Sequence, residues 1–251
     1  MTGRGNHTYL LVGPEGEAAL VDAGVGEPRH LAELARALGG ARLGHVLVTH
    51  GHADHASGAP ALARAHDAAA FSKYPWPGED GRHDVPWRHL GDGDRIAAAG
   101  VELRVLHTPG HSPDHVVFWH EASRTAFTGD LVVQGSSVMI HTSRGGNLGQ
   151  YLAALERLLA LDIQTLLPAH GPAVTEPAAL IRGYLEHRRL REQQVVAALE
   201  AGHATVEAIA ESIYHGLDPA LMAAARENVR AHLEKLGADE RAFDDDGRWH
   251  L

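Results

Sequence analysis

A chain of 251 residues is long enough to bury one sizeable domain, or one domain with a small appendage. Its formal net charge of −10 argues against a protein whose main task is to grip nucleic-acid phosphates, although a locally basic groove would be compatible with it. Cysteine is absent, which excludes disulfides and thiolate metal ligands, and no stretch has the apolar length of a membrane span or a signal core. We therefore expect a cytoplasmic protein without membrane contacts.

The first forty residues predict a hairpin followed by a helix. Residues 8–12 and 18–21 have strand character and flank a Gly-Pro turn, and residues 29–38 carry apolar side chains at helical spacing before a pair of glycines. Asp22 comes directly after the second strand. It is either a cap or turn residue, or an acceptor that steadies a metal-binding histidine, and we favour the second interpretation.

The most informative stretch is residues 49–55, which follow an apolar strand and precede a helix. With the spacing H-x-H-x-D-H, this stretch carries four potential metal ligands, His50, His52, Asp54 and His55. Imidazole and carboxylate groups suit Zn²⁺, Mn²⁺ or Fe, and α/β folds place their chemistry on loops after strands. The backbone cannot turn all four groups onto one tetrahedral ion. His50 and His52 can converge on one ion, and the other two residues can turn to a second. A polar surface loop is the alternative.

Residues 71–95 are rich in proline, glycine and charge. We interpret them as a loop with short strands that forms one wall of the active site. His83 and His89 lie in this segment, and we expect both to be surface histidines.

Three more strands or strand pairs are each followed by a turn and a potential ligand. The strands cover residues 101–106, 116–119 with 125–128, and 164–167, and the ligands after them are His111, Asp130 and His170. The sequence of strand, turn and ligand therefore occurs four times, which is hard to obtain by chance. Asp130 could be an ordinary turn residue, but its place after His111 favours a carboxylate that bridges two ions. A helix at 150–161 separates the last two ligands.

After residue 175 the predicted elements change in kind. A long helix over 177–200 and helical segments at 204–214 and 219–236 lead to a hairpin around Asp246-Gly247. Helices that close with a hairpin suggest a winged-helix module, a type that often binds DNA. Residues 176–251, however, hold nine Lys or Arg against fourteen Asp or Glu, a net charge of −5. We therefore expect a packing or dimerisation element, or a wall of the substrate cleft, and we divide the chain into domains 1–175 and 176–251.

Together these motifs resemble the metallo-β-lactamase superfamily over roughly residues 6–172. The family pattern is H-x-H-x-D-H, a lone His, an Asp and a final His, and all of its positions are present here. The likeness implies an α/β fold, the αββα sandwich, followed by a small, mostly α winged-helix-like module. A narrower resemblance points to the β-lactamase-like endoribonuclease subgroup, which carries such an extension. It rests on residues 6–10, 108–111, 151–155, 187–188 and 191–194.

Two features depart from the family pattern. The last ligand usually stands in Pro-Gly-His-Gly, whereas residues 168–171 read Pro-Ala-His-Gly, and the extra methyl group is expected to shift that loop slightly. Family members usually have another strand before the segment that starts at Asn6. Either that strand is absent or the start site is assigned late, and one sheet is then expected to have an exposed edge, which would suit a homodimer.

The resemblance also implies how the ligands divide. His50, His52 and His111 would hold one metal ion. Asp54, His55 and His170 would hold the second, with Asp130 bridging the two. A water between the ions would be hydroxide at neutral pH, and Asp54 would be catalytic, because its free oxygen could pass a proton to the leaving group.

Two other histidines are less certain in role. His115 is either structural or a substrate contact, and His141 lies in a Gly/Ser-rich stretch, 134–149, that we place at the cleft mouth.

The predicted function is that of a dinuclear-metal hydrolase, with zinc expected and manganese or iron as alternatives. A small-molecule ester, thioester or lactone is the favoured substrate, because the protein is acidic. The first alternative is a single-stranded RNA endoribonuclease. It would need a basic strip along the cleft, formed by Arg144, Arg182, Arg188, Arg189 and Arg191. The second is a metal-binding scaffold without catalysis that uses the C-terminal module for protein contacts, and redox or sulfur-transfer relatives of the fold complete the range.

Overall fold

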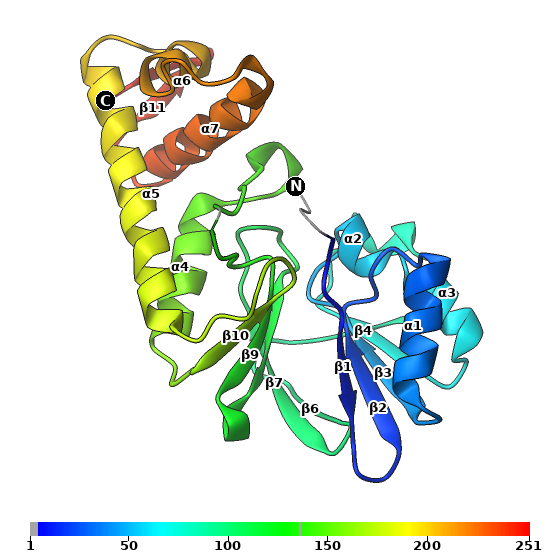
Figure 1. Ribbon diagram of the computed structural model, residues 1–251. Coiled ribbons are helices and arrows are strands. Elements are labelled where there is room, and N and C mark those ends of the chain that lie inside the picture. Colours follow the sequence, from blue (N-terminus) through cyan, green and yellow to red (C-terminus); the bar gives the residue numbers. More distant parts are fainter. Residues whose placement is uncertain (1–4, 136) are drawn as a thin grey trace.

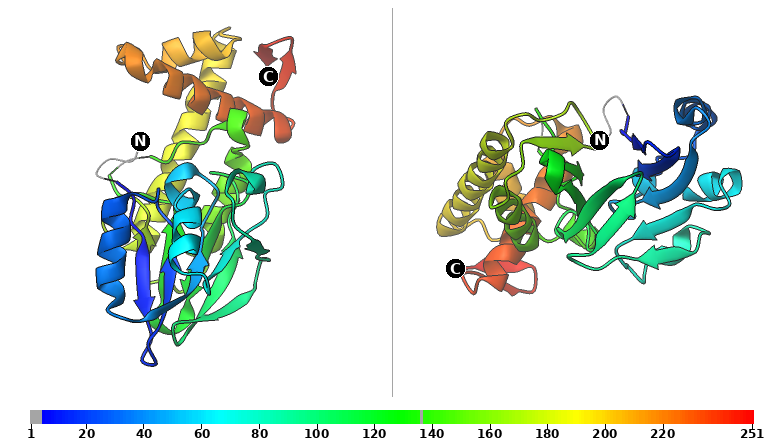
Figure 2. Two further views of the ribbon diagram at one scale, coloured as in Figure 1. Left: turned by 90° about the vertical axis from the view of Figure 1, so that its right-hand side faces the viewer. Right: turned by 90° about the horizontal axis from the view of Figure 1, so that it is seen from below.

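Two five-stranded sheets lie face to face, with helices on both outer faces and a helical module at one end (Figures 1 and 2). The computed structural model describes residues 5–135 and 137–251. This is the αββα sandwich that the sequence predicted. Among the described residues, no helix is both long and apolar enough to cross a membrane.

The first sheet has the strand order β1-β2-β3-β4-β5. Its strands are β1 (Tyr9–Val12), β2 (Glu17–Val21), β3 (Arg42–Leu47), β4 (Ala70–Lys73) and β5 (Trp87–His89). The first two form the predicted antiparallel hairpin, and the rest run parallel. Helices α1 (Pro28–Leu38) and α3 (Ala59–Ala65) bury their apolar stripes on the outer face, and the four-residue α2 (Ala53–Ala56) lies inside the metal-ligand motif. β1 lies at one edge of this sheet.

The second sheet has the order β10-β9-β8-β7-β6. Its strands are β6 (Arg95–Ala98), β7 (Val101–His107), β8 (Val116–His120), β9 (Thr125–Gly129) and β10 (Thr165–Pro168), with only β9 and β10 parallel. The period-two pattern of β7 turns Leu103 and Val105 toward the first sheet, where they pack with Val21 and Leu47. The opposite face packs on helix α4 (Leu148–Leu159).

The C-terminal part contains the predicted long helix and the predicted terminal hairpin. Its elements are α5 (Pro177–Glu200), α6 (Val206–Ile213), α7 (Met222–Ala238), β11 (Phe243–Asp245) and β12 (Arg248–His250). The second half of α5 packs in a separate apolar core with α6 and α7, whereas Ile181 and Tyr184 of its first half belong to the core under α4. α5 therefore joins the sandwich to the module, and the boundary after residue 175 stays a prediction.

The differences from the predicted elements are small and have local causes. Strand β6 was not predicted, because Arg95 at its start and the alanines after Ile96 give little strand signal. β3 begins four residues earlier than the apolar run suggested, since Gly44 and His45 interrupt that run. Four short 3₁₀ turns complete the fold: η1 (Asp80–Arg82), η2 (Glu121–Ser123), η3 (Thr142–Arg144) and η4 (Pro219–Leu221).

One glycine beside the ligand loops has no room for a side chain. Gly110 has a φ of +132°, and an added Cβ would lie 2.3 Å from the backbone nitrogen of Tyr151.

We expect Gly110→Ala to lower the free energy of unfolding by roughly 2–4 kcal/mol, through steric overlap and backbone strain together. Urea unfolding of the metal-free protein measures the change. Gly183→Ala is the matched control: with nothing within 4 Å of the new methyl group in the middle of α5, it should stabilise slightly. Equal stability of Gly110→Ala and the wild type would contradict the crowding argument.

Candidate metal centre

All the candidate ligands lie at one end of the sandwich, where four strands reach their carboxyl ends. The loop after β3 carries His50, His52, Asp54 and His55, while His111, Asp130 and His170 follow β7, β9 and β10. The first sheet thus supplies four groups and the second sheet three. Packing of the two sheets brings all seven together, although they are spread over some 120 positions of the chain.

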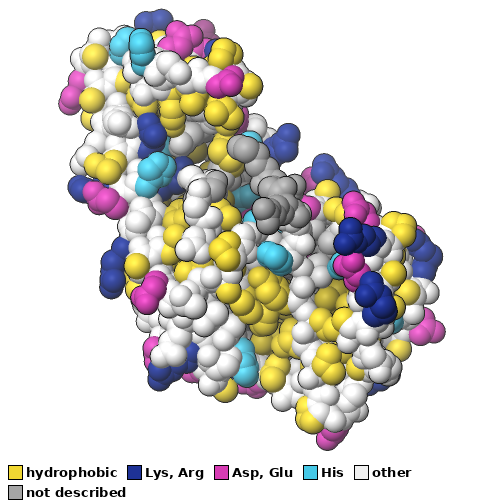
Figure 3. Space-filling view, viewed as in Figure 1, with side chains coloured by type: hydrophobic (Ala, Val, Ile, Leu, Met, Phe, Trp, Pro, Cys, Tyr) yellow, Lys and Arg dark blue, Asp and Glu magenta, His cyan; other side chains and the backbone are white. Residues whose placement is uncertain are grey.

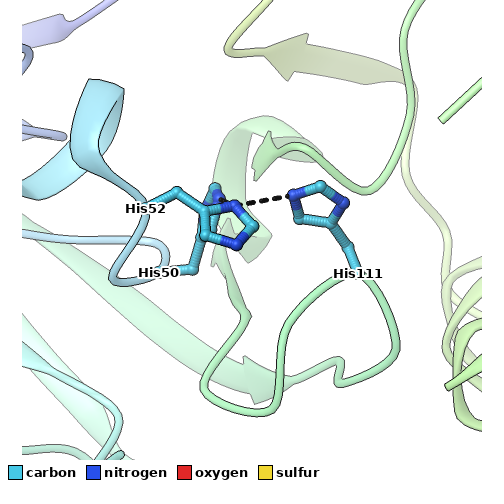
Figure 4. A group of neighbouring side chains, drawn as sticks. All are labelled: His50, His52 and His111. Carbon is cyan, nitrogen blue, oxygen red and sulfur yellow. Dashed lines mark hydrogen bonds between the residues drawn. The ribbon is translucent and has the colours of Figure 1, made fainter. Parts of the chain in front are cut away.

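His50, His52 and His111 form the first cluster, and their rings point toward one another (Figure 4). His52 Nδ1 lies 2.9 Å from His50 Nε2 and 3.0 Å from His111 Nε2. Two nitrogens bound to one tetrahedral zinc ion at about 2.0–2.1 Å stand roughly 3.3 Å apart. A small outward movement of the rings would therefore accommodate an ion between them.

Asp54, His55 and His170 form the second cluster. Asp54 Oδ2 lies 3.3 Å from His170 Nε2 and 3.7 Å from His55 Nε2. These separations are longer than ordinary charge-assisted hydrogen bonds. They match a group of ligands that face a common point better than they match direct pairs.

Asp130 lies between the two clusters and presents one oxygen to each. Its Oδ1 is 3.4 Å from His55 Nε2 and 3.3 Å from His170 Nε2, in the second cluster. Its Oδ2 is 3.5 Å from His111 Nε2, in the first. This is the geometry that a carboxylate bridging two cations would have.

Hydrogen bonds on the far side of three rings fix which nitrogen faces the centre. His111 Nδ1 donates to the carbonyl oxygen of Met139 at 3.1 Å, and His170 Nδ1 donates to that of Gly5 at 3.0 Å. His55 Nδ1 donates to Asp22 Oδ2 at 2.8 Å. With the proton on Nδ1, each Nε2 keeps a lone pair for a cation. Asp22 is therefore the steadying acceptor that the sequence suggested.

His115 is structural and does not face the cleft. It is fully buried, its Nδ1 donates to Thr108 Oγ1 at 2.9 Å, and its Nε2 accepts the backbone N–H of Asp130 at 3.2 Å. Gly129, with a φ of +48°, allows this approach, since an added Cβ would lie 2.9 Å from His115 Nε2. His115 thus holds the backbone of Asp130 through one hydrogen bond.

Burial and charge leave the imidazoles of the first cluster neutral and the carboxylates ionised. Burial lowers the pKa of His50 and His52, and it lowers the pKa of His111 to about 4. Burial alone would raise the pKa of Asp130, but the neighbouring His55, above all, holds it well below the usual range. Neutral imidazole with ionised carboxylate is the protonation state that a divalent cation requires.

Two buried atoms at the centre lack a hydrogen-bond partner within the described part of the chain. They are His55 Nε2 and Asp130 Oδ1. Unpaired buried polar atoms are rare in folded proteins because each costs roughly 1–3 kcal/mol. A cation at this position would satisfy both atoms, so the residues fit a metal centre.

The clusters form the floor of a cleft of about 1390 Å³. One wall is the segment before β5, with Trp76, Glu79, Arg82 and His83, and the opposite wall contains Val133 and residues between Ser137 and Arg144. Part of the segment 71–95 and His141 therefore line this cleft, and their place at an active site stays a prediction. His83 is a correction: it lines the cleft, because η1 folds this segment over the site. His89 has a side-chain exposure of 55%, as expected of a surface histidine.

The basic strip that an RNA-binding cleft would need is not formed. Of the five arginines proposed for it, only Arg144 lines the cleft. Arg188 is buried and Arg189 pairs with Glu186. On the face seen in Figure 3, Lys and Arg side chains are scattered, many beside acidic ones.

Comparison with known proteins assigns the family. A profile of the Metallo-beta-lactamase superfamily matches residues 1–170. The chain belongs to the metallo-β-lactamase superfamily. Members of this superfamily are generally metal-dependent hydrolases. A second profile, the Beta-lactamase associated winged helix domain, matches residues 205–249, so the winged-helix interpretation of the C-terminal module is confirmed.

Curated relatives within the superfamily carry several names. The chain is 35% identical over 204 residues to the Lactamase-like protein aptB of Emericella nidulans, covering 80% of this chain and 62% of that protein. It is 34% identical over 200 residues to the Atrochrysone carboxyl ACP thioesterase of Claviceps purpurea, covering 79% and 61%. The chain therefore spans about three-fifths of the length of these two relatives. A Beta-lactamase-like protein 2 homolog of Drosophila melanogaster is 30% identical over 251 residues, covering 94% and 83%.

Solved structures agree with the superfamily fold. A Beta-lactamase domain protein from Burkholderia ambifaria superposes with a TM-score of 0.82 at 23% identity, covering 98% of this chain and 86% of that one. The protein TTHA1623, solved in a di-iron-bound form, gives a TM-score of 0.58 at 31% identity over 69% of this chain and 91% of that one.

Two buried charged residues, Lys73 and Asp114, and the half-buried Asp80 support the superfamily motif and were not predicted. The backbone N–H of Gly51 donates to Asp114 Oδ2 at 2.7 Å, and Lys73 Nζ lies 3.1 Å from the same oxygen. Lys73 also pairs with Asp80, whose other oxygen accepts the backbone N–H of Trp76 at 3.0 Å. The network ties the H-x-H loop to one cleft wall. Asp114, three positions after His111, was the available signal, whereas lysines are seldom buried and Lys73 gave none.

Asp22 provides the sharpest test of the hydrogen-bonded support in this metallo-β-lactamase fold. In Asp22→Asn, the amide oxygen is held by Thr49 N–H, so the amide NH₂ would face His55 Nδ1–H. That clash of donors favours the other tautomer of His55, with the proton on Nε2. We expect one bound metal ion to be weakened roughly 10- to 100-fold, measured by competition with a chromophoric chelator. The exposed Asp67→Asn is the matched control, and unchanged affinity in Asp22→Asn would exclude this role for Asp22.

Proposed function

We propose that this protein is a dinuclear metal hydrolase that cleaves a thioester or a related small ester or lactone. The observation that carries the proposal is the pair of three-residue ligand clusters that meet at Asp130 on the floor of a cleft. The complete ligand set argues against a non-catalytic scaffold.

In the proposed centre, His50, His52 and His111 would hold one cation, and Asp54, His55 and His170 would hold the other. Asp130 would contribute to both, and the two buried atoms that lack hydrogen bonds would then have a partner. Imidazole and carboxylate ligands suit zinc, our first assignment, and also manganese or iron. TTHA1623, with its two bound irons, is a relative with a similar fold and two metals.

Two divalent cations, when bound, lower the pKa of a water molecule between them to about 7 and polarise the substrate carbonyl. The remaining work falls to the protein side chains. Asp54 directs Oδ2 toward the second cluster and is partly exposed to the cleft. Its Oδ1 can accept a proton from the attacking water and return it to the departing thiolate or alkoxide. The cleft walls then orient the acyl group over Asp54.

The thioester assignment is supported by the cleft and by one relative. Trp76, Val133, Val138, Met139 and Pro172 give the cleft an apolar lining suited to an acyl group. The two Lys or Arg side chains in that lining are Arg82 and Arg144, too few for a polyanion. The relative from Claviceps purpurea is named as a thioesterase.

Removing one ligand from either cluster should abolish turnover. We expect His50→Ala and Asp130→Ala to reduce hydrolysis to the background rate and to lower the metal content measured by elemental analysis. His215→Ala, an exposed histidine in the C-terminal module, is the control and should keep both properties. Full turnover in His50→Ala would show that the proposed mechanism is wrong.

A substrate panel separates the candidate activities. It contains acyl-CoA thioesters, p-nitrophenyl esters, homoserine lactones and a fluorescent single-stranded RNA, each tested with zinc and with manganese. We expect the thioester to be cleaved with the highest kcat/KM, and this activity to vanish in His50→Ala. RNA cleavage that persists through purification and is lost in His50→Ala would instead identify a ribonuclease.

A further inference from the structure

Helix α5 holds one cleft wall at two points, one turn apart on the same helix face. The hydroxyl of Tyr184 donates to the carbonyl oxygen of Val133 at 2.8 Å and accepts the backbone N–H of the same residue at 3.1 Å. Four positions further along α5, Arg188 donates to the carbonyl oxygen of Val138. Val133 and Val138 are therefore both attached to α5.

Arg188 is an unusual residue to find there. Its exposure is 2%, and it forms no ion pair with a carboxylate of the described chain. It instead donates to Ser137 Oγ at 3.3 Å and to Asn228 Oδ1 of α7 at 3.1 Å, and its guanidinium lies 5.7 Å from the ring centre of Tyr151. A buried cation without a counter-ion is costly, so its retention calls for a specific task. The guanidinium of arginine presents its donors in a rigid planar fork that reaches acceptors several ångströms apart, whereas the ammonium of lysine is a compact group.

The residue after Val138 contacts the metal centre directly. The carbonyl oxygen of Met139 accepts the hydrogen bond from His111 Nδ1 at 3.1 Å. Two neighbouring carbonyl groups therefore have different partners. That of Val138 accepts a hydrogen bond from Arg188, and that of Met139 accepts one from the ring of His111. In the second cluster, the rings of His55 and His170 donate instead to Asp22 and to the carbonyl oxygen of Gly5, and neither acceptor belongs to the C-terminal module.

We propose that Arg188 is a positioning residue through which the C-terminal module fixes His111 and so sets the affinity of the first metal ion. This inference rests on the proposed function, because it takes His111 as a ligand. Arg188 anchors Val138, Met139 keeps the proton of His111 on Nδ1, and Nε2 stays aimed at the first cluster.

The module supports Arg188 from behind. Asn228, which accepts from Arg188, also donates to the hydroxyl of Tyr214 at the end of α6 at 2.9 Å. Glu227, one residue earlier on α7, accepts from Ser143 Oγ of the same wall at 3.3 Å. The C-terminal module therefore contacts one wall of the cleft through both α5 and α7.

The test measures metal binding rather than turnover. Purified, metal-free Arg188→Met is titrated with Zn²⁺ against a chromophoric chelator. We expect the affinity for one ion to fall roughly 10-fold, which is the lower end of the losses seen when a residue hydrogen-bonded to a metal ligand is removed. The affinity for the other ion should stay within about twofold of the wild type. In a His111→Ala background, Arg188→Met should cause no further loss. In a His170→Ala background, its full effect should remain.

Two further variants keep the outcome decisive. Arg189→Met changes the neighbouring, exposed arginine and should leave both ions unaffected. Arg188→Lys keeps the charge and the aliphatic stem, so it serves if Arg188→Met does not fold, and it should weaken the same ion. The inference would be overturned if Arg188→Met or Arg188→Lys bound both ions with unchanged affinity. It would also be overturned if both ions were weakened equally. Either result would leave the proposed function intact. A wild-type protein that binds fewer than two ions would instead remove the proposed function itself.

Discussion

The carboxylate of Asp130 is the group on which the whole centre depends, because it is the one side chain whose two oxygens face different clusters. Its position is set by the packing of the two sheets. The first sheet supplies the H-x-H-x-D-H loop and the second supplies Asp130, so any sliding of one sheet on the other would separate them. The apolar core between the sheets, with Val105 and Phe118 facing Leu47, therefore determines the geometry of the polar site as much as the polar residues do.

Crowding so many imidazoles and carboxylates into a buried space is unfavourable unless each has a partner. The two clusters meet this requirement for partners in different ways. The first contains only neutral imidazoles, whose pKa values burial lowers. In the second, burial alone would lower the pKa of His55, but Asp22 and Asp130 raise it well above its usual value. The second cluster therefore places two carboxylates beside His55, whereas the first cluster contains only imidazoles.

Much of the fold and of the candidate site could be predicted from the sequence because the information was local. Each candidate ligand follows a strand and a turn, and the spacing of 50–55 predicts more than one ion, so the seven residues could be named without coordinates. Their roles as ligands remain predictions.

The sequence could not predict the roles of residues whose surroundings come from parts of the chain far away in sequence. Arg188 is followed by another arginine and looks like any exposed helix residue, yet it is buried because α7 and the wall segment cover its face. Lys73 and His83 were missed for the same reason: both are polar residues at strand ends or in loops, and only tertiary packing places them at the site.

The walls of the cleft, rather than its floor, must determine the substrate, since the ligand set fits many hydrolases. One wall is tied to the floor through Lys73 and Asp114, and the other is tied to the C-terminal module through Arg188. Each wall contributes one arginine to the cleft lining. Arg82 forms an ion pair with Glu79 at 2.5 Å, whereas Arg144 forms no ion pair with any described residue. One unpaired cation beside an apolar lining agrees with the acyl substrate proposed above. A nucleic-acid strand presents a charge at every nucleotide and would need a continuous row of cations, which the described lining of the cleft does not contain.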